Sequence, residues 1–164
     1  MTQRPTPEEV AEWLVEENRR TAQIIRRHGV FIQYVGSDDV RRSTAFAYTV
    51  GLFGLGHPEL LVLGLSSSTA GSLLNTVAER VRAGADLSPG QVLEFEEWTH
   101  RVAVEVLPNP AQILFAANSY YQRPDEASVP AYQLSYDDRD GRFPWDAGYD
   151  VPAWIQPRPG EFRA

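Results

Sequence analysis

The sequence contains no cysteine and no lysine, and each absence removes several classes of chemistry. Without cysteine, the chain can form no disulfide, no thiolate nucleophile, no zinc–thiolate site and no iron–sulfur cluster. Without lysine, it can have no Schiff-base mechanism, no lysine general base and no Walker-type phosphate loop. We interpret the exclusive use of arginine as the genomic composition of a GC-rich bacterium rather than as a sign of mechanism.

The chain also lacks long apolar runs and a surplus of positive charge. No run approaches the roughly 18 apolar residues of a membrane-spanning helix, and the first residues have no apolar core typical of a signal peptide. The expected location is therefore the cytoplasm. The net charge is −7, without a long basic stripe. Nucleic acid is excluded as an expected partner, because binding to phosphates needs clustered cations.

The 164 residues, 43% of them hydrophobic, indicate one globular domain. Thr6, Pro7 and Glu9 form an N-cap, first-turn proline and capping-box pattern, which predicts a helix to about His28 with Gly29 after its end. We therefore expect an N-terminal helix packed on the domain in residues 1–29. A single α+β domain should occupy residues 30–147, and an irregular tail residues 148–164.

Alternating or continuous apolar residues predict the strands, and capping patterns predict two more helices. The expected strands cover residues 30–35, 45–50, 60–65, 91–97, 101–107 and 131–136, and the further helices residues 66–82 and 109–121. This order indicates an α+β fold with three helices and a mainly antiparallel sheet of about six strands. Such a sheet could close partly or form a split barrel.

The segment from Gly51 to Glu59 contains glycines, a histidine and a carboxylate before an apolar strand. Its glycines do not form a dinucleotide-binding loop, because they lead into another strand rather than a helix N-terminus. His57 and Glu59 could supply two metal ligands, but no HxH or HExxH spacing provides the others. We expect no metal site and interpret His57 as a structural or ligand-contacting residue.

Four hydroxyl residues open the helix predicted at residues 66–82. Ser66, Ser67, Ser68 and Thr69 could simply cap this helix, or their hydroxyls and the free N–H groups could hold a phosphate or carboxylate. The surrounding sequence lacks the second glycine of a GxSxG nucleophile elbow, which argues against acyl transfer.

A second dense segment runs from Asp137 to Trp145 and combines acids, arginines and aromatic residues. Its acids do not fit an EF-hand, because Tyr136 and Ala147 would occupy ligand positions 1 and 12. We predict an acid–arginine lock in which Asp137 or Asp138 pairs with Arg139 or Arg142. Phe143 and Trp145 would then cover the sheet or a groove beside Tyr120 and Tyr121.

These segments lead to one site hypothesis, since aromatic and arginine residues dominate binding hot spots. If the two dense segments meet in space, a pocket between them is the expected ligand site. Its candidate residues are Tyr48, Thr49, His57, Glu59, Tyr120, Tyr121, Gln133, Arg139, Arg142 and Trp145. The predicted function is a small-molecule or partner-binding domain without an evident catalytic motif. The sequence does not set the oligomeric state.

The two segments, taken in this order, resemble the bacterial domain of unknown function 4262. The matching residues are 46–52, 56–60, 64–65, 133–134 and 138–145. Family members more often have Trp-Pro-Asp where this chain has Tyr136-Asp137-Asp138. The resemblance spans roughly residues 30–147 and implies no established activity.

Two alternative functions remain open. The order of predicted elements is also similar to the start of flavin-binding split barrels, because a hairpin and an apolar strand precede a helix that Ser66–Thr69 open. In those barrels, helix N-termini, hydroxyls and arginines hold the flavin phosphate. This likeness implies an oxidoreductase with a flavin or related cofactor. The other alternative is an immunity or accessory protein that binds a co-encoded partner.

Overall fold

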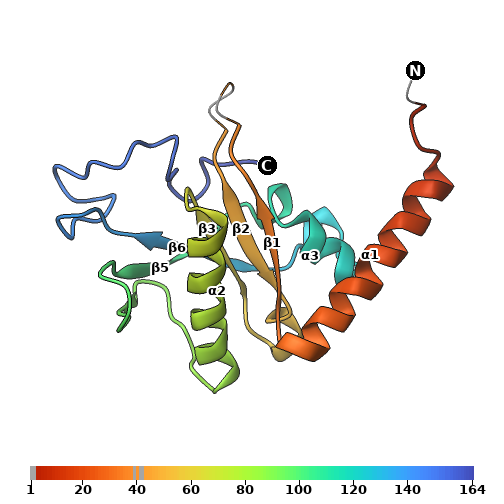
Figure 1. Cartoon of the computed structure of the whole chain (residues 1–164), viewed down its shortest axis with the longest axis horizontal. Coiled ribbons are helices and arrows are strands. Elements are labelled where there is room, and N and C mark those ends of the chain that lie inside the picture. Colours follow the sequence, from red (N-terminus) through yellow and green to blue (C-terminus); the bar gives the residue numbers. More distant parts are fainter. Residues whose placement is uncertain (1–2, 39, 41–42) are drawn as a thin grey trace.

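The computed structural model describes residues 3–38, 40 and 43–164 (Figure 1). The first two residues of the predicted N-terminal segment therefore lie outside the described residues. The α-helices are α1 (Pro7–His28), α2 (Ser67–Arg82) and α3 (Phe115–Tyr120), and short 3-10 helices are η1 (Phe53–Leu55), η2 (Pro110–Gln112) and η3 (Asp125–Ala127). The strands are β1 (Phe31–Val35), β2 (Phe46–Val50), β3 (Glu59–Leu63), β4 (Val92–Leu93), β5 (Val102–Val106) and β6 (Ala131–Tyr136).

The six strands form one sheet in the order β1-β2-β3-β6-β5-β4. All neighbours are antiparallel except β3 and β6, which are parallel. The predicted α+β class, with six strands and three helices, is confirmed. However, the sheet is mixed because the last strand enters between β3 and β5. The sheet is also open rather than a barrel, since β1 and β4 end it without pairing to each other.

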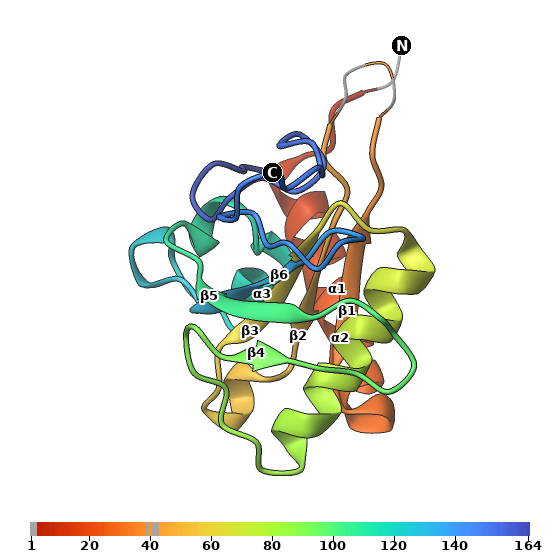
Figure 2. The same ribbon diagram turned by 90° about the vertical axis from the view of Figure 1, so that its left-hand side faces the viewer.

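Helices cover both faces of this sheet (Figures 1 and 2). On one face, Leu74 and Val77 of α2 pack with Leu60 and Val62 of β3. On the other face, Leu61 and Leu63 of β3 belong to a second apolar cluster with Ile113 and Leu114, and Ile25 of α1 packs against this cluster. Residues 60–63 of β3 are at most 1% exposed, which confirms the prediction that this apolar strand is covered on both sides.

Helix α1 has the predicted terminal geometry. The hydroxyl of Thr6 accepts a hydrogen bond from the N–H of Glu9, whose carboxylate accepts one from the N–H of Thr6. At the other end, Gly29 adopts φ +92° and its N–H bonds to the carbonyl of Ile25. The first half of α1 extends beyond the body of the molecule (Figure 1), and Thr21 is its one buried residue among those described. No described helix has the length and apolar character needed to cross a bilayer.

Two predicted elements differ from the structure. Of the strand expected at residues 91–97, only the two residues of β4 form a strand. In place of the single helix expected at residues 109–121, the structure has the two separate elements η2 and α3. Asn109, the first residue of the capping pattern that predicted this helix, makes no side-chain cap hydrogen bond. Its side-chain amide instead donates hydrogen bonds to the carbonyl of Phe162 and to the side chain of Gln112. A contact with the chain's tail thus replaces the local helix start.

The last residues of the chain contain no helix or strand but are attached closely to the sheet. The amide of Gln156 accepts a hydrogen bond from the N–H of Tyr136 and donates one to its carbonyl, as a neighbouring strand would. Gly64 permits this approach, because a Cβ on it would lie 2.1 Å from the carbonyl oxygen of Ile155. The tail therefore completes the edge of β6 beyond its pairing with β3.

Candidate functional site

The two segments emphasised by the sequence lie at opposite ends of the sheet (Figure 1). β3 and β6 run in the same direction, with Glu59 level with Ala131. The glycine–histidine connector (residues 51–58) precedes β3, whereas the acidic turn (residues 137–145) follows β6. The five steps along β6 separate these levels by about 17 Å at 3.3 Å per residue. The prediction of one groove between the two segments is therefore wrong.

Glu59 organises the glycine–histidine connector from inside the protein. Its side chain is fully buried. It accepts four hydrogen bonds of 2.8–3.0 Å, from the hydroxyl of Thr49 and from the N–H groups of Gly51, Leu52 and Phe53. These N–H groups lead into η1, where a negative charge is favoured. The carboxylate therefore acts as the hydrogen-bond acceptor for backbone N–H groups that a sharp turn leaves without a backbone acceptor.

The protonation of Glu59 depends on two opposing effects. Burial raises the pKa of its carboxyl, while the hydrogen bonds from Phe53, Gly51, Thr49 and Leu52 lower it, and the net direction is upward. All four partners can donate: the hydroxyl of Thr49 accepts a hydrogen bond from a backbone N–H and so turns its own proton toward Glu59. The contacts thus match the ionised form, although burial opposes the charge.

An aromatic layer covers the outside of this connector. The hydroxyl of Tyr121 accepts a hydrogen bond from the N–H of Gly54, and its ring packs edge-on against Phe53. The guanidinium of Arg123 lies 5.4 Å from the centre of the Phe53 ring. Burial and then the charge of Glu59 raise the pKa of Tyr121 to about 12. Tyr121 therefore remains a neutral phenol that steadies the turn.

His57 does not converge with Glu59 on a shared ligand. Its Nδ1 lies 2.7 Å from the carbonyl oxygen of Pro58, and its ring packs edge-on against Tyr132. Its buried Nε2 has no hydrogen-bond partner within the described part of the chain. Tyr132 borders the core under α2, whereas Glu59 turns into the connector. The two side chains therefore do not form the beginning of a metal site.

Three other candidate residues are buried in the core. The hydroxyl of Tyr48 accepts a hydrogen bond from the N–H of Ala116, and burial raises its pKa to about 12. The hydroxyl of Thr49 donates a hydrogen bond to the carboxylate of Glu59. The amide of Gln133 donates a hydrogen bond to the carbonyl of Pro157. These side chains join elements to one another and are at most 2% exposed.

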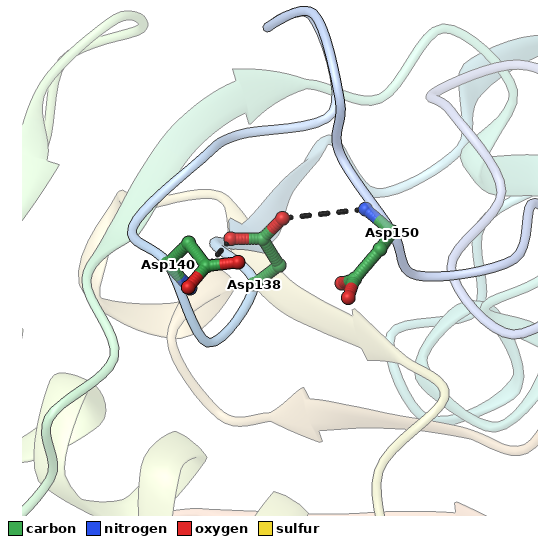
Figure 3. Close-up of side chains that lie close together, drawn as sticks. All are labelled: Asp138, Asp140 and Asp150. Atoms are coloured by element: carbon green, nitrogen blue, oxygen red, sulfur yellow. Dashed lines mark hydrogen bonds between the residues drawn. The ribbon is translucent and has the colours of Figure 1, made fainter.

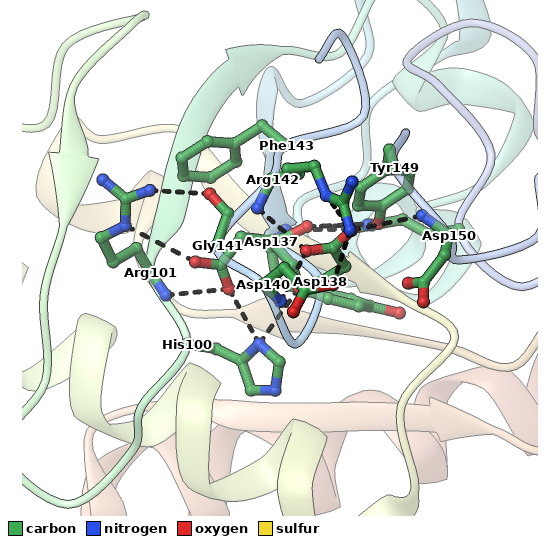
Figure 4. A network of polar contacts seen from close by, with 12 residues as sticks. His100, Arg101, Asp137, Asp138, Asp140, Gly141, Arg142, Phe143, Tyr149 and Asp150 are labelled. Atoms are coloured by element: carbon green, nitrogen blue, oxygen red, sulfur yellow. Dashed lines mark hydrogen bonds and ion pairs between the residues drawn. The ribbon is translucent and has the colours of Figure 1, made fainter. Parts of the chain in front are cut away.

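The acidic turn forms a polar network with the start of β5 (Figure 4). One oxygen of Asp137 lies 2.8 Å from Nδ1 of His100 and accepts the N–H of Arg101. The other oxygen lies 3.5 Å from the guanidinium of Arg101. Asp138 pairs with Arg142 at 3.4 Å, which is one of the predicted acid–arginine contacts. The lock also uses His100 and Arg101, which are distant in the sequence.

Asp138, Asp140 and Asp150 bring carboxylate oxygens within 4.8 Å of one another (Figure 3). The oxygens of Asp138 are already occupied, since they accept the N–H groups of Asp140, Arg142 and Asp150. Burial acts to raise the pKa of Asp138, but these hydrogen bonds and the charge of Arg142 outweigh it and hold the pKa below its ordinary value. The carboxylate therefore shapes the loop.

The aromatic residues after this turn do not lie beside Tyr120 and Tyr121, as the sequence had suggested. Phe143 and Trp145 stack with ring centres 4.9 Å apart. The guanidinium of Arg101 lies over Phe143 and that of Arg158 over Trp145. These contacts attach the acidic turn to β5 and to the tail. Arg139 is exposed, and Tyr120 lies with Tyr121 near the other end of the sheet.

A groove that the sequence did not suggest lies between α2 and the segment after β4. It has a volume of about 560 Å³, within the range typical of small-molecule sites. We call it the α2 groove; its lining residues are Ser68, Thr69, Ser72, Leu73, Thr76, Arg80, Phe95, Glu96, Glu97 and Trp98.

One wall of the α2 groove is a row of polar side chains on a single helix face. Ser68, Ser72, Thr76 and Arg80 follow one another at four-residue spacing, which places them on adjacent turns. The hydroxyls of Ser72 and Thr76 make no hydrogen bond to any described residue. This four-residue spacing is visible in the sequence, although the predicted cofactor-binding residues included only the start of the helix.

The opposite wall carries two aromatic rings. Phe95 and Trp98 have ring centres 6.0 Å apart, and the guanidinium of Arg80 lies 4.7 Å from the centre of the Phe95 ring. Arg80 also donates a hydrogen bond to the carbonyl of Glu94, which joins the two walls. The sequence predicted a strand here, so these rings were not expected beside α2.

Of the four predicted cofactor-binding residues, Ser68 and Thr69 line the α2 groove. Ser66 is the N-cap of α2, and its hydroxyl accepts a hydrogen bond from the N–H of Thr69. Ser67 is exposed at the first position of the helix. Capping therefore accounts for Ser66, while two of the remaining hydroxyls border open space.

An open mixed sheet with helices on both faces defines the protein as a small α+β protein. Within that class, the chain belongs to the family described as a domain of unknown function, DUF4262, whose model matches residues 24–150. The match contains both the glycine–histidine connector and the acidic turn. No curated protein and no solved structure matches the chain.

Proposed function

We propose that this protein is a small-molecule-binding domain and that its ligand lies in the α2 groove. The observation that carries the proposal is the row of hydroxyls on α2 opposite Trp98. Ser72 and Thr76 present hydroxyls that bond to no described residue, in a hollow of about 560 Å³. Ligand sites commonly combine aromatic walls with a few polar groups that fix orientation.

The chemistry of the two walls favours a neutral ring compound with several hydroxyl groups, such as a sugar or a nucleoside. Phe95 and Trp98 offer apolar ring faces, and the hydroxyls of α2 can donate or accept hydrogen bonds. Glu96 and Glu97 outnumber Arg80 in the lining, and the whole chain carries a net charge of −7. These charges disfavour a strongly anionic ligand.

A flavin is the main competing ligand. Its phosphate would use the start of α2, where Ser68 and Thr69 border the groove. The open sheet does not support a split-barrel enzyme, and the acidic lining opposes the phosphate. A flavin belongs in the test because it would occupy the same groove with its phosphate at the start of α2.

The test is a ligand-detected NMR screen of the full chain with monosaccharides, nucleosides and flavin mononucleotide. We expect binding of a neutral ring compound that weakens in Ser72→Ala and Thr76→Val. Each of these two variants loses one hydrogen bond to the ligand, and the affinity for the ligand should fall by about 2- to 13-fold per lost bond. Asn75→Ala is the matched control, since Asn75 is an exposed residue of α2 outside the groove.

Two results would reject this proposal. One is the absence of binding by any neutral ring compound, including the case in which flavin mononucleotide alone binds. The other is binding that Asn75→Ala weakens as much as Thr76→Val does. Retention of a protein partner in place of any small molecule would instead support the accessory-protein alternative.

A further inference from the structure

The outer edge of β1 is open. β1 is the first strand of the sheet and pairs with β2 alone. Figures 1 and 2 show α2 on one face of this strand and α1 on the other. Four of the five side chains of β1 are only partly exposed, and Val35 at its end is exposed, so the faces of the strand are largely covered.

The pairing of β2 shows which backbone groups of β1 point outward. The N–H of Gly64 bonds to the carbonyl of Ala45, so residue 45 directs its backbone groups toward β3. Directions alternate along an antiparallel ladder, and residues 46, 48 and 50 therefore direct theirs toward β1. Their partners are residues 35, 33 and 31. The N–H and C=O groups of Ile32 and Tyr34 consequently point away from the sheet.

The two edges of the sheet differ in how they are protected against pairing. β4 has only two residues and is followed by Glu94, Glu96 and Glu97. Short edge strands and nearby charges hinder the addition of another strand. β1 has five residues, Phe31–Val35, with no charge and no proline. Its sequence is rich in the β-branched and aromatic residues that favour strand pairing.

We propose that β1 is a homodimer interface in which a second copy of the chain adds its own β1 antiparallel to the first. The two-fold axis passes beside Gln33, which then lies opposite Gln33 of the second copy. Ile32 lies opposite Tyr34 of the second copy, and these residues exchange backbone hydrogen bonds through the groups that point outward. The two sheets become one continuous sheet, and each interface residue is used twice.

The strand is self-complementary about Gln33. Ile32 and Tyr34 both pack toward the α2 core, so their pairing keeps apolar side chains on one face. The outward backbone groups also belong to these two residues, one on each side of Gln33, so a two-fold axis beside Gln33 pairs every outward group with its counterpart. This symmetry favours a second copy over an unrelated extended peptide.

The absence of cysteine allows a direct test of this register. Gln33→Cys places one thiol beside the proposed axis, where antiparallel residues outside the hydrogen-bonded pairs lie close enough for a disulfide. We expect mild oxidation to convert this variant to a covalent dimer. Val92→Cys is the control, because Val92 is an exposed residue of the opposite edge strand. Equal cross-linking of both variants would overturn the proposal.

A charge-swap experiment tests the same interface without a covalent bond. The parent chain should sediment with twice the mass of one chain, whereas Gln33→Glu and Gln33→Arg should each sediment as monomers, since like charges meet at the axis. Mixing the two variants should restore the dimer. A monomeric parent, or a mixture that stays monomeric, would overturn the proposal. Circular dichroism of each variant separates lost dimerisation from lost folding.

Discussion

Replacement of Glu59 by glutamine should destabilise the protein strongly, although the side chain keeps its length and shape. In the parent, one carboxylate oxygen accepts hydrogen bonds from Thr49 and Leu52, and the other from Gly51 and Phe53. The amide of a glutamine has one acceptor oxygen, and its NH₂ group would face two donors. Two buried donors then lose their partner, each at a cost of about 1–3 kcal/mol.

The expected loss is therefore about 2–6 kcal/mol of unfolding free energy, a large part of the 5–15 kcal/mol typical of a domain. Urea unfolding of the parent and Glu59→Gln measures this difference. Glu126→Gln, at an exposed position, is the control and should change little. If Glu59→Gln lost less than about 0.5 kcal/mol, the size of an ordinary surface substitution, the connector would not depend on this carboxylate.

The pH dependence of the same variant tests the direction of the pKa of Glu59. Burial raises this pKa above its ordinary value of 4.5, so the folded protein binds the proton more readily than the unfolded chain. The stability linked to this carboxyl is complete below pH 4.5 and is lost as the pH rises through the higher folded pKa. This decrease should disappear in Glu59→Gln. An identical slope in both proteins would contradict the burial argument.

Three further predictions concern the other end of the sheet. Folding lowers the pKa of Asp138, so the stability that this carboxylate contributes should disappear as the pH falls from 3.8 through the folded pKa. In Asp138→Asn, the unfolding free energy should therefore decrease less steeply at acid pH than in the parent. Gly64→Ala should lose more than about 2 kcal/mol from left-handed strain and overpacking, since its Cβ meets the tail; Gly56→Ala, with a similar φ but open space, should lose less in urea unfolding. Gln156→Ala should expose the tail to limited proteolysis because Tyr136 loses both bonds from this amide, and unchanged cleavage would contradict the proposed attachment.

Short-range patterns in the sequence were sufficient for many elements of the fold. The capping box at Thr6 and Glu9 predicted the start of α1, and the apolar run that contains Leu60 predicted a strand covered on both faces. The pairing of Asp138 with Arg142 was also predicted. Each of these features depends on residues a few positions apart, and local hydrogen bonds and side-chain periodicity therefore determine them.

Long-range pairing decided the features that the sequence did not reveal. The insertion of β6 between β3 and β5 separates the acidic turn from the glycine–histidine connector, and no local signal specifies the order of strands. The start of α2 and its hydroxyls were predicted from the sequence, and Ser68 and Thr69 do line the α2 groove. Its other wall needs Phe95 and Trp98 to fold beside that helix. The sequence alone thus determined most of the elements and the local pairing of Asp138 with Arg142, whereas the burial of apolar faces in three dimensions decided which elements share a site.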